Sequence, residues 1–157
     1  MMKNIITWLA LVAAGFGLFH YQPWQNEAGT SPQSVAGEQA RPSENGAAER
    51  ILQQAFAERR SDIQIEGEGV VKKVLPDDNK GSRHQRFILR LNSGQTLLVA
   101  HNIDLADKIT GLQPGDTVQF YGEYEWSKQG GVIHWTHRDP AGRHADGWLR
   151  HNGKVYQ

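Results

Sequence analysis

Histidine and aspartate residues gather near the C-terminus in a pattern that could bind a metal ion. Six of the seven histidines lie between residues 84 and 151, and two of them begin His-x-Asp pairs that flank a Pro-Ala-Gly-Arg turn. Residues two apart share a face of an extended chain, so each imidazole is expected beside its aspartate, and the turn lets the two pairs face each other. Imidazole and carboxylate groups suit Zn²⁺ and other first-row divalent ions, so a divalent metal such as zinc is the cofactor that the sequence suggests. The predicted metal ligands are His134, His137, Asp139, His144 and Asp146.

The same residues also have a purely structural interpretation, which the sequence leaves open. In it the aspartates form the turn, and hydrogen-bonded histidines hold a C-terminal tail against the domain. The spacing matches no established zinc motif. The metal interpretation predicts a phosphodiesterase-like hydrolase in which the ion lowers the pKa of a bound water, whereas the structural one predicts a binding module without catalysis.

A second candidate site is a basic stripe on one predicted strand. His84, Arg86 and Arg90 recur with a period of two, and Tyr121 is expected to be exposed on another strand. Basic groups with exposed aromatic rings suit single-stranded nucleic acid or an anionic polysaccharide. However, residues 61–157 contain twelve basic and twelve acidic residues. Cross-strand ion pairs are therefore the alternative, with four glutamates as partners, and nucleic acid is disfavoured. Those glutamates are Glu66, Glu68, Glu123 and Glu125.

Composition excludes several function classes. The 157 residues include 17 basic and 17 acidic side chains and no cysteine. The absence of cysteine rules out disulfides, thiolate-bound metals and a thiol nucleophile. No serine lies in a nucleophile turn, and no glycine-rich phosphate loop is present. The length allows one ordinary domain with extensions.

The segment 61–157 is predicted to be β structure. Apolar residues alternate with polar ones in five runs, separated by glycine-containing turns, and glycines in the first run predict a long, bent strand with a bulge. After the third run, Ile103, Ala106 and Ile109 would share one helical face, with Asn102 as the N-cap. Three strands, a short helix and two strands match the order of the oligonucleotide/oligosaccharide-binding (OB) fold. The predicted fold is all-β, a five-stranded OB-like barrel with one short inter-strand helix.

Three segments precede this domain. Residues 47–60 are predicted to form an amphipathic helix that packs on it, with Ile51, Leu52, Ala55 and Phe56 on one stripe. Residues 22–46 have too few apolar side chains to offset the entropy of ordering and are expected to be a disordered linker. Residues 1–21 contain an apolar run, which predicts either a signal peptide or a short membrane-spanning helix.

Five runs of sequence carry a resemblance to a known family. They are GSRHQRF at 81–87, LVAHNIDL at 98–105, FYGEYEW at 120–126, GVIHWTH at 131–137 and DP-x-GRH-x-DGW at 139–148. On these runs, residues 50–157 resemble a family of small exported bacterial proteins catalogued only as a domain of unknown function. The resemblance implies that the protein is located outside the cytoplasm, and it assigns no activity to any residue.

The apolar N-terminal run then predicts the location. Bulky residues at 16–21 disfavour cleavage, so an uncleaved anchor is preferred over a removed signal peptide. The expected location is the bacterial inner membrane, single-pass, with a periplasmic domain; secretion after cleavage is the alternative. The preferred function is a tethered binding module for a small ligand, a glycan or an envelope protein, and the alternative is the metal-dependent hydrolase.

Overall fold

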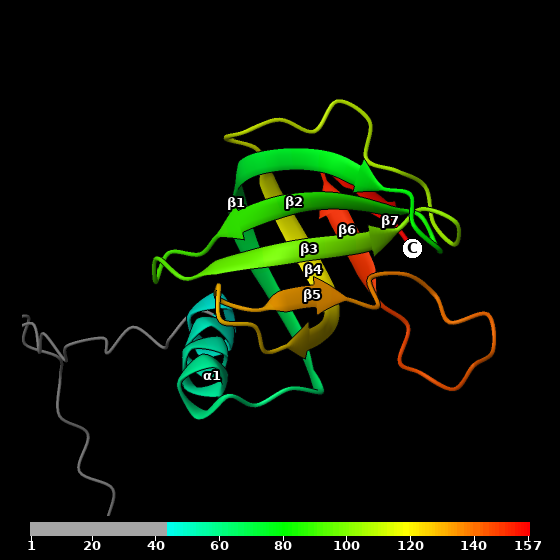
Figure 1. Cartoon of the computed structure of the whole chain (residues 1–157). Helices are drawn as coiled ribbons and strands as arrows, with labels where there is room; N and C mark the ends of the chain where they lie inside the picture. The colour runs from blue at the N-terminus through cyan, green and yellow to red at the C-terminus, as the bar shows by residue number, and fades with distance from the viewer. Residues whose placement is uncertain (1–43) are drawn as a thin grey trace, which may run out of the picture. The chain divides into compact units, whose positions relative to one another are not determined.

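The computed structural model describes residues 44–157, which form one helix and seven strands of a single sheet (Figure 1). The predictions for residues 1–21 and for the linker up to residue 43 lie outside these described residues. Within residues 44–157 no helix is long and apolar enough to cross a membrane. The elements are α1 Glu44–Glu58, β1 Ile63–Asp78, β2 His84–Arg90, β3 Thr96–Asn102, β4 Thr117–Glu125, β5 Val132–His134, β6 Trp148–His151 and β7 Lys154–Tyr156.

Five of the strands pair in a circuit that returns to its start. β1 pairs with β2, β2 with β3, β3 with β5 in parallel, β5 with β4, and β4 again with β1. The long first strand makes closure possible, because its first half, from Ile63 to Val70, pairs with β4 and its second half pairs with β2. A register shift between Val71 and Lys73 accompanies this bend. The predicted bulge in a long first strand is therefore present.

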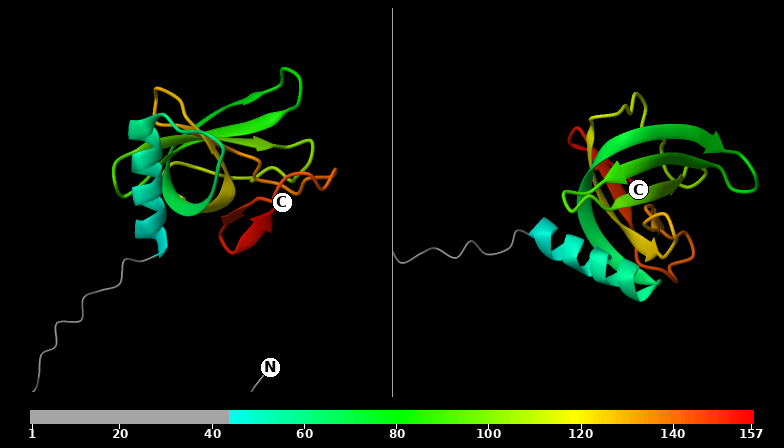
Figure 2. Two further views of the ribbon diagram at one scale, coloured as in Figure 1. Left: turned by 90° about the horizontal axis from the view of Figure 1, so that it is seen from below. Right: turned by 60° about the vertical axis from the view of Figure 1, so that its left-hand side comes forward.

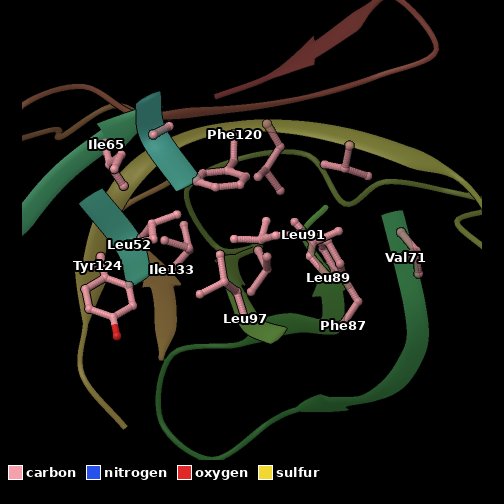
Figure 3. Close-up of a cluster of buried hydrophobic side chains, with 14 of the residues drawn as sticks. Leu52, Ile65, Val71, Phe87, Leu89, Leu91, Leu97, Phe120, Tyr124 and Ile133 are labelled. Atoms are coloured by element: carbon pink, nitrogen blue, oxygen red, sulfur yellow. The ribbon is translucent and has the colours of Figure 1, made fainter. Parts of the chain in front are cut away.

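The alternating sequence pattern places one face of each strand inside the circuit. Every second residue of β2, β3 and β4 is buried, as expected for strands with one apolar face. Figure 3 shows the resulting cluster, into which Leu52 of α1 also projects. Its fully buried members include Phe87, Leu89, Leu97, Phe120, Tyr124 and Ile133.

Helix α1 lies alongside the curved first strand (Figure 2). It begins three residues before the expected start, and it ends where Arg59 takes a left-handed conformation (φ 55°). Leu52 and Ala55 are buried in the core, whereas Ile51 of the predicted stripe is 45% exposed. The carboxylate of Glu49 accepts hydrogen bonds from the backbone of the β2–β3 turn, at Asn92 and Ser93. The helix is thus tied to the sheet by both apolar and polar contacts.

The predicted short inter-strand helix is wrong, because residues 103–110 form turns instead. One hydrogen bond of helical type forms here, from the amide of Ala106 to the carbonyl of Asn102, but neighbouring strands bind other backbone groups of the segment and no helix continues. Gln85 exchanges two hydrogen bonds with the backbone of Ile109, and the ring of His101 binds the carbonyl of Asp107. Asn102 accepts from the amide of Asp104, which is a turn bond and not a helix cap.

The segment expected to be a C-terminal tail contains two further strands. β6 pairs with β4, and β7 pairs with β6, so the sheet continues beyond the circuit. Asn152 and Gly153, both at positive φ, connect them. An Asn-Gly pair is the preferred turn of a two-residue hairpin.

Candidate functional site

A chain of three polar side chains connects β4, β5 and the loop 135–147. This loop leaves the end of β5 and returns as β6 (Figure 1). Glu123 and His134 are direct cross-strand partners, and their side chains approach to 3.3 Å between Oε1 and Nε2. The other carboxylate oxygen of Glu123 lies 2.7 Å from Nε2 of His144 in the loop. Glu123 therefore lies between two imidazoles, one on the sheet and one on the loop.

His144 is held in a defined orientation by two acceptors. Its Nδ1 lies 2.8 Å from the carbonyl oxygen of Ala145, and its Nε2 contacts the carboxylate of Glu123. Both nitrogens must donate to satisfy these partners, which requires the protonated ring. Partial burial lowers the pKa of His144, but the hydrogen bond to Glu123 and the Ala145 carbonyl outweigh this effect and raise the pKa above its ordinary value.

Trp135 provides an aromatic surface beside this chain. Its ring stacks on the His144 ring, with centroids 4.1 Å apart and planes 7° apart. The ring of His137 is tilted against the Trp135 ring, with centroids 5.4 Å apart. The Trp135 backbone is at φ 52°, an uncommon conformation for a bulky residue. Backbone strain of this kind persists where surrounding contacts hold it, and the ring contacts here are such a constraint.

A small cavity of about 210 Å³ opens beside Trp135. It lies where β2 begins and β3 and β5 end, so three elements and the loop contribute to its wall. Three imidazoles, an amide and an indole line it, together with two aliphatic side chains. The lining residues are His84, Ala100, Asn102, Leu105, His134, Trp135 and His137.

A larger cavity of about 640 Å³ lies between α1 and β1, but its lining is different. Aliphatic side chains of both elements, carboxylates and amides line it, and it holds no imidazole and no aromatic ring. We place the candidate site at the smaller cavity, because potential ligand-binding groups of several chemical types converge there.

The five predicted metal ligands do not form one cluster. Asp139 accepts hydrogen bonds from the backbone amides of Ala141, Arg143 and His144, and these bonds lower the pKa of its carboxyl. Asp146 accepts from the amide of Asp139. Both aspartates therefore stabilise the loop, as the structural interpretation expects, and only His134 joins a group of potential ligands within residues 44–157.

His137 lies apart from that group of potential ligands. The ring is buried and its Nδ1 binds the carbonyl of Arg138, while the side chain lines the small cavity together with His84. Its predicted partner Asp139 is engaged by the loop backbone. The expected pairing of each histidine with the aspartate two residues later does not occur for a physical reason: the segment folds as a tight loop and not as two extended arms.

Three atoms from β4 and β5 do form a compact set of potential metal ligands. A carboxylate oxygen of Glu123, one of Glu125 and a ring nitrogen of His134 all lie within 4.8 Å of one another. The Nε2 atom of His134 is shielded from solvent and has no hydrogen-bond partner. Neither glutamate was among the predicted ligands. Their spacing of two on one strand was visible, but the sequence does not show that β4 pairs with β5 in this register.

The predicted basic stripe is dispersed. His84 lines the small cavity, whereas the guanidinium of Arg86 donates twice to the carbonyl of Pro76. Arg90 is exposed at the far end of β2. It lies about 20 Å from His84, because each residue of an extended strand advances the chain by about 3.3 Å. Tyr121 lies beside Trp148 of β6, with ring centroids 6.3 Å apart. His84, Arg86 and Arg90 share the less buried face of β2, but no cavity or set of contacts within residues 44–157 brings the four predicted residues together.

The expected ion pairs between β2 and the four glutamates are also not formed. Arg83, just before β2, binds the carboxylate of Asp104, and Glu68 accepts from Gln119. Glu123 and Glu125 face His134 and not an arginine. Asp77 of β1 pairs instead with Lys108, which lies after β3.

Residues 39–157 match the family described as Protein of unknown function (DUF3465). The chain belongs to this family. The match covers most of the chain and includes the sheet, the loop 135–147 and helix α1. A search of the curated proteins finds no significant match. The family match supports the resemblance found from the sequence, and the DUF3465 domain carries no established activity that could be transferred to the residues above.

Proposed function

We propose that this DUF3465 domain is an OB-like barrel that serves as a binding module for a small polar ligand. The cavity beside Trp135 carries this proposal, because it brings three imidazoles, an amide and an indole to one place. The strand order β1-β2-β3-β5-β4, closed by pairing of β4 with β1, supports the OB-like assignment. Ligands of that fold bind on the middle strands, and His84 and Asn102 stand at the ends of those strands here.

The lining of the cavity indicates which ligands fit. Imidazole and amide groups donate and accept hydrogen bonds, while the indole and Leu105 offer apolar surface. A cavity of about 210 Å³ is smaller than most drug-sized sites, so it fits one ring or the end of a longer molecule. A neutral, hydroxyl-bearing ring such as the terminal sugar of an envelope glycan meets these requirements.

An anionic polymer is a poorer ligand for the same surface. The arginines nearest to His84 in the sequence are engaged within the domain, since Arg83 pairs with Asp104 and Arg86 binds a backbone carbonyl. The chain as a whole is neutral, with 17 basic and 17 acidic residues. Long-range attraction of a polyanion is therefore weak.

The proposed location is the periplasmic face of a bacterial inner membrane. The apolar run in residues 1–21 would anchor the chain, and residues 22–43 would connect the anchor to the domain. A tethered module would meet glycans or proteins of the envelope at short range.

The experiment that tests the function is a binding titration of full-length protein in detergent, with N-acetylglucosamine and its short oligomers as probes. Isothermal calorimetry measures the dissociation constant of the wild type and of two variants of β2. His84→Ala removes a cavity-lining imidazole and is expected to weaken binding about tenfold, which corresponds to one lost hydrogen bond. Arg90→Ala, at the other end of the same strand, is the matched control and is expected to leave the constant unchanged.

Two results would contradict the proposed site. The first is binding that His84→Ala leaves intact. The second is binding of an anionic polymer that Arg90→Ala weakens, since this would move the ligand surface to the basic end of β2. A panel of neutral sugars that all fail to bind would overturn the ligand class.

A further inference from the structure

The ligand atoms of Glu123, Glu125 and His134 lie close to the spacing that a bound transition metal needs. A tetrahedral ion with bonds of about 2.0–2.1 Å to nitrogen and oxygen places its ligand atoms about 3.3 Å apart. Nε2 of His134 lies 3.3 Å from an oxygen of Glu123 and 3.8 Å from an oxygen of Glu125. Only small side-chain movements would bring these three atoms onto one ion.

A second, independent observation concerns the ring nitrogen itself. Nε2 of His134 is shielded from solvent and makes no hydrogen bond, although two carboxylates lie nearby. A shielded polar atom without a partner is unfavourable, and native proteins rarely leave one unexplained. An ion bound between the imidazole and the two carboxylates would give this atom the partner it lacks.

His144 holds the central carboxylate in place. It contacts one oxygen of Glu123 at 2.7 Å, which leaves the other oxygen facing His134. The stack of His144 on Trp135 and the Ala145 carbonyl fix the orientation of its ring. Groups that orient a ligand from behind are common in metal sites.

We propose that Glu123, Glu125 and His134 form a binding site for a first-row divalent ion such as Zn²⁺, with His144 as a positioning residue. The imidazole disfavours Mg²⁺ and Ca²⁺, which prefer oxygen ligands, and the absence of thiolates disfavours copper(I). Three protein ligands leave a fourth position for water or another donor. This site differs from the ligand set predicted from the sequence. It shares His134 with the lining of the small cavity, but it does not require that a sugar binds there.

The test measures zinc binding to full-length protein prepared without an affinity tag and stripped with a chelator. Equilibrium dialysis followed by elemental analysis is expected to show one Zn²⁺ per chain, and added Zn²⁺ is expected to raise the melting temperature. Glu125→Gln and Glu123→Gln are each expected to weaken binding at least ~100-fold. His144→Gln is expected to weaken it about 10–100-fold, as for other residues that orient a ligand.

Controls separate this site from other carboxylates and histidines. Glu66→Gln changes an exposed carboxylate on the neighbouring strand β1, and His151→Gln removes an imidazole of β6 whose ring binds Asp116 and not one of the three ligands. Both variants are expected to bind Zn²⁺ as the wild type does. If Glu123→Gln does not fold, Glu125→Gln still tests the site, because Glu125 is more exposed. Absence of stoichiometric zinc in the wild type, or undiminished zinc binding in Glu125→Gln, would overturn the proposal.

Discussion

At the scale of single residues, His101 makes a clear prediction about pH. Its ring is fully buried, with Nδ1 bound to the Thr136 hydroxyl and Nε2 to the Asp107 carbonyl. Burial is the main cause that lowers the pKa of His101 to about 4; the nearby rings of His137 and His84 act in the same direction, and the two hydrogen bonds oppose them. The unfolded chain binds a proton near pH 6.5, so the stabilisation is complete above that pH and is lost as the pH falls towards 4.

The expected loss of unfolding free energy from His101 is about 2 kcal/mol between pH 8 and pH 5. Denaturant unfolding at the two pH values measures it, with His101→Gln as the comparison, because the amide does not titrate. The wild type should lose about 2 kcal/mol more than the variant. Equal pH dependence of the two proteins would show that the buried ring does not titrate in this way. His144 acts in the opposite direction, since its raised pKa adds stability at low pH, and it is present in both proteins.

At the scale of elements, Gly147 controls how the loop 135–147 meets β4. A Cβ atom at this position would lie 1.9 Å from the carbonyl oxygen of Trp135 and 2.6 Å from that of Tyr121. Gly147→Ala is therefore expected to displace the loop and to destabilise the domain by about 1–3 kcal/mol. The displacement should also break the contact between His144 and Glu123, so that the pKa of His144 falls towards its ordinary value. Denaturant unfolding and an NMR titration of the ring measure the two effects.

The matched control for Gly147 lies in the same loop. Gly142 is at φ 61°, and a Cβ atom added there would meet open space, so Gly142→Ala costs only the backbone strain, about 1–2 kcal/mol. This variant should leave the pKa of His144 raised. If Gly147→Ala also leaves that pKa raised, then close approach of the backbone at Gly147 is not what positions the loop.

At the scale of the whole molecule, the proposed tether predicts how the protein fractionates. Full-length protein is expected to stay with the membrane after a carbonate wash, because residues 5–21 are largely apolar. A chain beginning at residue 22 is expected in the soluble fraction. Immunoblotting of the two fractions, with mass spectrometry of the N-terminus, measures the outcome. A soluble product of the full-length gene that begins after residue 20 would show that the segment is a cleaved signal peptide.

Local patterns in the sequence determined much of the sheet. The alternation of apolar and polar residues predicts the strands β2, β3 and β4, because side chains on successive residues point to opposite faces of any strand. The bend of the first strand was also visible, since glycines interrupt its pattern. The Asn152-Gly153 pair was an available signal for the hairpin of β6 and β7, and the very short strands around it concealed that signal.

Contacts between distant segments decided the rest. The spacing of Ile103, Ala106 and Ile109 fits a helix, yet Gln85 and His101 bind the backbone of this segment and hold it in turns. The candidate metal site shows the same dependence. His134 was identifiable as a ligand type, but its partners Glu123 and Glu125 are set by the register of β4 against β5. A residue's type and local spacing are properties of the sequence alone. Its partners across a sheet depend on how the strands pair, because a one-residue shift in register would move every side chain of a strand to the other face.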